Sequence, residues 1–81
     1  MKYVPKSICS QLKKICKEDD GSFRGLGVDE NLDRLAAVLK TSNLPADIFD
    51  ALMPLKVALE KAGEKEKAKY VATILNGLIT P

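Results

Sequence analysis

The stretch from Leu44 to Gly63 is LPADIFDALMPLKVALEKAG, and its pattern predicts a long helix. Pro45 suits the first position of a helix, where its missing N–H has no helical partner in any case. Gly63 suits the left-handed position at which helices commonly end. Between these two residues, apolar side chains recur every three or four positions, which is the spacing of one helical face. That buried face is predicted to contain Ile48, Leu52, Leu55 and Leu59.

Pro54 interrupts this helix in the middle. A proline inside a helix removes one hydrogen bond and clashes with the preceding turn, which costs about 3 kcal/mol or more. The apolar face nevertheless keeps its phase across the proline, which favours one continuous, kinked helix. A new helix that begins at Pro54 is the alternative.

Three other segments show the same periodicity. They are expected at about Pro5 to Glu18, from an N-cap at Asp29 to the region 41–43, and at about Glu64 to Leu78. No stretch alternates with the two-residue period of a strand. The predicted fold class is therefore all-α. It is a single domain over residues 1–81, a small bundle of four amphipathic helices, or five if the chain breaks at Pro54.

Acidic residues and a loop complete this prediction. Glu30 and Asp33 are expected in the first turn after Asp29, and Asp47 near the free amides at the start of the helix that follows Leu44. The loop from residue 19 to 27 contains three glycines, and its apolar residues are expected to hold it on the core; these are Phe23 and Leu26.

Composition indicates a small globular domain. The chain has 81 residues, of which 46% are hydrophobic and 30% charged. A chain of this length buries only about 60 to 65% of the surface that its unfolded form exposes, so its stability margin should be small. There is no apolar run long enough for a membrane span and no signal-peptide pattern, so a soluble, cytoplasmic protein is expected. The net charge of +2 is unevenly distributed: residues 1–24, 25–52 and 53–81 carry +3, −3 and +2.

Catalytic and metal-binding patterns are missing from the sequence. The chain has no histidine, the usual general base, and only two cysteines, Cys9 and Cys16. These cysteines should lie roughly 10 Å apart on one helix, too far for a bridge, and are expected to be reduced thiols. An intermolecular disulfide or a metal shared between two copies is the functional alternative for them. The loop before Asp29 lacks the pattern of a phosphate loop or of a calcium loop. We therefore expect no cofactor, no bound metal and no enzymatic activity.

The helix after Pro45 and the last helix carry more apolar residues than one buried face needs. In so small a domain some of this surface should stay exposed unless another molecule covers it. This pattern predicts a non-enzymatic interaction protein, such as an adaptor, an assembly subunit or an inhibitor, that binds a protein partner or forms a homo-oligomer. The alternative is that all of these side chains fill one core. The predicted partner-binding residues are Phe49, Met53, Val57, Tyr70, Ile74 and Ile79.

Nucleic-acid binding is the alternative function. A helix-turn-helix is disfavoured, because the helix that would enter the groove begins with Asp47 and Asp50 instead of basic residues. Lysines on the first and last helices could instead form a nonspecific basic face. The candidate contacts are Lys6, Lys13, Lys14, Lys17, Lys65 and Lys69.

Overall fold

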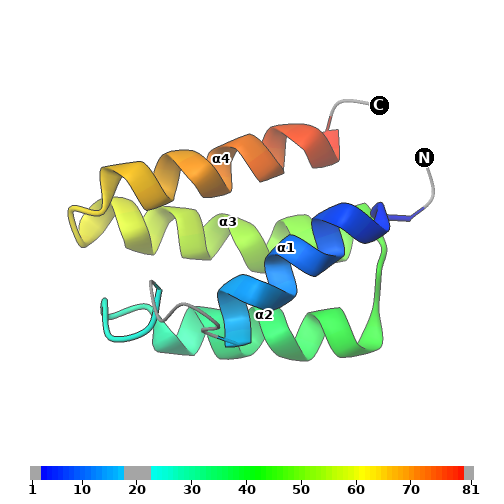
Figure 1. The fold of residues 1–81 in the computed structure, drawn as a ribbon, viewed down its shortest axis with the longest axis horizontal. Helices are drawn as coiled ribbons and strands as arrows, with labels where there is room; N and C mark the ends of the chain where they lie inside the picture. Colours follow the sequence, from blue (N-terminus) through cyan, green and yellow to red (C-terminus); the bar gives the residue numbers. More distant parts are fainter. Residues whose placement is uncertain (1–2, 18–22, 80–81) are drawn as a thin grey trace.

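The computed structural model describes residues 3–17 and 23–79, and within these ranges it contains four helices and no strand (Figure 1). The helices are α1 (Lys6–Lys17), α2 (Asp29–Thr41), α3 (Pro45–Lys61) and α4 (Lys65–Ile79). The predicted all-α bundle is confirmed, and each described boundary lies within a residue or two of its predicted position. The side chains of Lys17 and Ile79, and the predicted helix end at Glu18, lie outside the described part.

α3 is the central helix, because it packs against both α2 and α4. It starts at Pro45, as predicted, and ends at a Schellman motif around Gly63. In that motif the Gly63 amide donates to the Glu60 carbonyl at 3.1 Å, and the Glu64 amide donates to the Leu59 carbonyl at 2.9 Å. Gly63 has a φ of 80°, which a residue with a Cβ adopts only with strain. This turn reverses the chain and places α4 alongside α3.

Pro54 lies inside α3, and the helix continues through it. The prediction of one continuous helix is confirmed, and the alternative of a helix beginning at Pro54 is wrong. At about 100° per residue, Pro54 lies roughly 160° around the helix from Leu52, which is fully buried. The proline thus occupies the outer side of α3, where the carbonyl left without a helical donor can meet water.

In Figure 1, α2, α3 and α4 lie side by side, and α1 crosses diagonally over α3 and α2. A backbone hydrogen bond from the Val4 amide to the Asn43 carbonyl, 2.7 Å long, ties the segment before α1 to the α2–α3 connection. At the other flank, Ile8 of α1 lies against Gly77 of α4, so close that an added Cβ would stand 3.7 Å from the Ile8 Cδ1 atom. α1 therefore covers one face of the three-helix layer.

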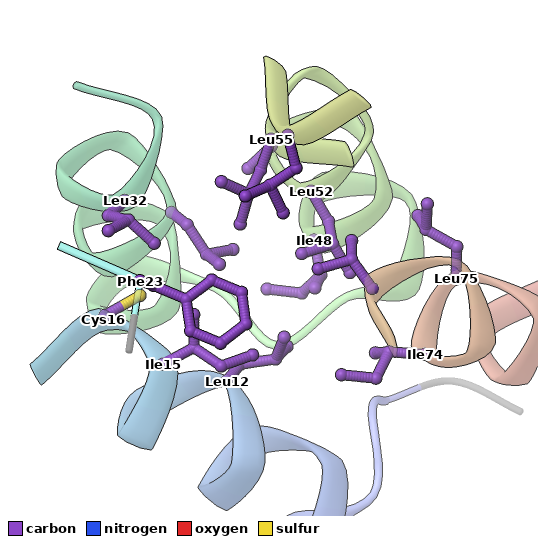
Figure 2. Close-up of a cluster of buried hydrophobic side chains, with 14 of the residues drawn as sticks. Leu12, Ile15, Cys16, Phe23, Leu32, Ile48, Leu52, Leu55, Ile74 and Leu75 are labelled. Carbon is purple, nitrogen blue, oxygen red and sulfur yellow. The ribbon is translucent and has the colours of Figure 1, made fainter. Parts of the chain in front are cut away.

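The core lies between α1 and this layer (Figure 2). Leu12 and Ile15 of α1 meet the buried residues of α3, and Ile74 and Leu75 close the side formed by α4. These α3 residues form its inner row: Ile48, Leu52, Leu55 and Leu59. Phe23, from the segment before α2, is buried in the same cluster, and Leu26 packs against it, as predicted. Within the described ranges no polar or charged side chain is buried. Apolar burial is therefore the main source of stability.

The start of α2 differs from the prediction. Val28, not Asp29, occupies the N-cap position, and its carbonyl accepts the amide of Leu32 at 3.1 Å. The Asp29 carboxylate turns back to accept the Gly25 amide at 3.0 Å, so it stabilises the loop. The prediction of Asp29 as N-cap is wrong, because the helix begins one residue earlier than a cap at Asp29 requires and the Asp29 carboxylate bonds to the loop amide of Gly25.

Asp33 and Asp47 also have side-chain partners outside their own helices. Asp33 forms an ion pair with Arg24 at 3.0 Å, and Arg24 also donates to the Cys16 carbonyl at 2.9 Å, which ties the end of α1 to α2. Asp47 does lie in the first turn of α3, but its carboxylate accepts the Ser42 hydroxyl at 2.7 Å. The prediction that the Asp47 carboxylate meets free backbone amides directly is wrong. The carboxylate is linked to the Leu44 amide through the Ser42 hydroxyl, whose Oγ atom accepts that amide.

Candidate protein-binding surface

The outer side of α3 carries large apolar side chains in contact with solvent. Met53 is 40% exposed and Val57 is 37% exposed. At about 100° per residue, these two residues lie roughly 100° and 140° from Leu52, on the side away from the core. Phe49, one turn before Met53, is half-buried and packs against the edge of the core. These three predicted binding residues thus share one flank of α3.

Phe49 and Met53 also line a shallow groove between α3 and α4. The opposite wall of the groove is formed by Ala72, Leu75 and Asn76, and Lys56 closes one end. The groove encloses about 140 Å³. Sites for drug-sized ligands measure roughly 300 to 1,000 Å³, so this groove fits an inserted side chain better than a whole metabolite.

The groove continues along the same helix pair into a charged recess. Glu60 of α3 and Lys65 and Lys69 of α4 line this recess, together with Lys56. Lys56 is already paired, since its ammonium lies 3.1 Å from the Glu60 carboxylate. Lys65 and Lys69 are exposed. The α3–α4 surface is therefore apolar at the Phe49 end and basic at the Lys65 end.

Two other predicted binding residues lie on a different flank of α4. The ring of Tyr70 is 42% exposed and packs against Phe23, with the ring centroids 6.4 Å apart. Ile74 is only 5% exposed and belongs to the core, so it offers no accessible anchor. Its burial agrees with the alternative prediction that these apolar side chains fill one core. The side chain of Ile79 lies outside the described part.

The lysines proposed for nucleic-acid contact divide into two sets. Lys6, Lys13 and Lys14 are exposed on α1, and Lys13 lines a recess between α1 and α2 together with Lys40. Lys65 and Lys69 line the recess between α3 and α4. Lys13 of the first set and the pair Lys65 and Lys69 thus line separate recesses, and the side chain of Lys17 is not described.

The two cysteines are free thiols, as expected. Cys9 is half-buried, with its Sγ atom 3.9 Å from the Val4 carbonyl. Cys16 is buried, and burial raises the pKa of its thiol to about 11, an effect that Arg24 partly offsets and Asp33 reinforces. The thiolate is the reactive form of cysteine, so Cys16 is a poor nucleophile at neutral pH.

A search of residues 3–17 and 23–79 finds no cluster of three or more histidine, cysteine or acidic side chains with a geometry suited to a metal ion. In the same part of the chain, no helix combines the length and apolar character that a bilayer span requires.

The sequence pattern missed four residues that line the groove: Lys56, Ala72, Leu75 and Asn76. The helical periodicity placed Leu75 in the core, where it is largely buried, and it also forms part of the groove wall. Finding the other three requires knowing which helix packs against α3 and in which register the two helices align. That information comes from the Gly63 turn, whose geometry sets the register of α4.

Comparison with known proteins gives no match among protein-family models, curated proteins or solved structures.

Proposed function

We propose that this protein is a non-enzymatic interaction module, an adaptor, assembly subunit or inhibitor, whose outer α3–α4 surface is covered by another protein. One observation carries the proposal: Met53 and Val57 are exposed beside a groove lined by Phe49 and Leu75. Exposed apolar side chains that are contiguous with a groove are typical of interaction sites. Methionine suits such a surface, since its flexible thioether adapts to different partners.

The small volume of the Phe49 groove, about 140 Å³, supports contact with a protein side chain, whereas the adjoining charged recess of about 340 Å³ reaches the size of small-ligand sites. The groove accepts one or two side chains, and a basic recess extends it along the helix pair. An apolar anchor flanked by charged residues is the usual organisation of a protein interface, with a dry centre and a polar rim. Action in the cytoplasm is part of the same proposal.

Nucleic-acid binding is the competing proposal. Its support is limited to exposed lysines such as Lys13 and Lys14 on α1 and Lys65 and Lys69 on α4. Lysine-rich helix surfaces often serve only for solvation, and the two lysine sets line separate recesses. Phosphate-driven binding has a clear signature, because its affinity falls steeply as salt rises.

The test compares wild type with a Met53→Asp, Val57→Asp double variant and with a matched control, Lys14→Asp, at an exposed site on α1. Each tagged protein is used for affinity capture from the native host, and circular dichroism confirms that each variant is folded. We expect a protein, or the untagged copy of this chain, that wild type and the control retain and the double variant loses.

Equal capture by wild type and the double variant would contradict the proposed surface. Binding of duplex DNA or heparin that is tight at 50 mM salt and is lost near 200 mM would favour the nucleic-acid function instead.

A further inference from the structure

The outer side of α3 carries a row of residues that is complementary to itself. The row consists of Asp50, Pro54, Val57 and Lys61, at successive spacings of four, three and four, with Met53 beside it. Asp50, Met53, Val57 and Lys61 are exposed and Pro54 is half-buried. Met53 stands at the groove beside α4, and Asp50 stands at a recess beside α2, so the row runs along the solvent-facing side of α3 between its two neighbours. The row is acidic at its first residue, apolar in its centre and basic at its last.

Such a row matches a second copy that runs in the opposite direction. When two identical helices pack antiparallel about a two-fold axis, residues at equal distances from the axis face each other. An axis midway between Leu55 and Lys56 pairs Asp50 with the second copy's Lys61, and Pro54 with the second copy's Val57. Spacings of three and four are those by which helix surfaces interlock.

The charges of this row are available for pairing. Neither Asp50 nor Lys61 forms an ion pair within the described residues. Asp50 shares a recess with Arg34 of α2, yet the two groups form no ion pair there. In the antiparallel arrangement the Asp50–Lys61 pair forms twice, once at each end of the contact, and each carboxylate gains one basic partner. A parallel arrangement would instead set Asp50 against Asp50 and Lys61 against Lys61.

We infer that the protein that covers this surface is a second copy of the chain, docked through an antiparallel α3–α3 contact with Asp50 paired to Lys61 across the two-fold axis. This inference rests on the proposed function, because it names the partner of the same surface. A contact limited to one helix from each copy is smaller than a standard interface, so the dimer is weak, with a dissociation constant on the order of 0.1 mM.

The test uses charge reversal at the two ends of the row. Asp50→Lys and Lys61→Asp each place like charges opposite each other twice, and each is expected to weaken self-association about tenfold or more at low salt. An equimolar mixture of the two variants restores both attractive pairs, so the heterodimer should form about as tightly as the wild-type dimer, although each variant alone self-associates more weakly. A chain with both reversals regains the homodimer.

Sedimentation equilibrium measures these states, and one isotope-labelled variant in the mixture allows NMR to locate the contact on α3. Glu30→Lys and Lys14→Asp are matched controls, since they reverse exposed charges on α2 and α1 and should leave dimerisation unchanged. Melting curves of every variant confirm the fold.

Two outcomes overturn the inference: wild type that stays monomeric at about 1 mM, or variants whose mixture associates no better than either variant alone. If another protein is still captured in a way that depends on Met53 and Val57, the proposed function stands and only its partner changes. If capture and dimerisation are both absent, both proposals fail.

Discussion

The two sides of α3 consist of similar residues but differ in burial. The inner row, Ile48, Leu52, Leu55 and Leu59, is completely inaccessible to solvent. The outer side presents Met53 and Val57 to solvent, although Leu52 and Met53 are neighbours in the chain. Consecutive side chains on a helix point about 100° apart, so the direction of a side chain decides its burial when two neighbours are nearly equal in hydrophobicity. The inner side specifies the fold, and the outer side is available for contact.

The largest expected effect tests this difference at adjacent positions. Leu52→Ala should lower the free energy of unfolding by about 2 to 5 kcal/mol, since it removes a fully buried side chain and leaves a cavity. Met53→Ala should cost less, about 1 kcal/mol or below, because that side chain is 40% exposed and lies outside the core. Urea denaturation of dilute protein measures both values, and similar losses for the two variants would contradict the assignment of the two sides.

A smaller effect concerns the buried thiol of α1. Burial raises the pKa of Cys16 from 9.0 to about 11, so the folded state holds this proton more tightly than the unfolded state. The resulting stability is fully present below pH 9 and is lost as the pH rises through 11, a decline of about 2 to 3 kcal/mol. Unfolding measured from pH 8 to 11 should show a steeper decline for wild type than for Cys16→Ala. Cys9→Ala is the control, and a Cys16→Ala curve parallel to that of wild type would refute the prediction.

The smallest effect is expected on the outer side of α3. Pro54→Ala restores the missing helical hydrogen bond where the side chain faces away from the core, and it should raise stability by about 1 to 3 kcal/mol. Thermal melting at low micromolar concentration measures the gain without a contribution from dimers. An unchanged or lower melting temperature would show that the ring of Pro54 makes contacts that offset the lost bond.

Much of this architecture could be predicted from local signals. Pro45 and Gly63 mark the ends of α3 through restrictions on their own backbones, and the inner row keeps its phase across Pro54. These properties depend only on residues close in sequence, so periodicity and capping rules capture them.

The errors arise where a loop or a neighbouring helix supplies a partner that helical periodicity does not describe. Asp29 bonds to the Gly25 amide, and Asp33 bonds to Arg24, because the loop folds back over the start of α2. Ile74 lies in the core, as the alternative of one filled core predicted, so it is not an accessible anchor. The sequence also could not show that the predicted binding residues belong to two separate surfaces. Phe49, Met53 and Val57 share a flank of α3, whereas Tyr70 of α4 packs against Phe23.

The order in which the helices pack has a consequence for how the chain reaches this structure. Contacts between α1 and α2, between α2 and α3, and between α3 and α4 all join elements that follow one another in the sequence. Proteins dominated by such short-range contacts typically fold within microseconds to milliseconds, since little loop entropy is lost before contacts form. The link from Val4 to Asn43 spans a longer stretch, and closing a longer loop costs more entropy, so we expect the amino-terminal segment to close over the other helices late in folding.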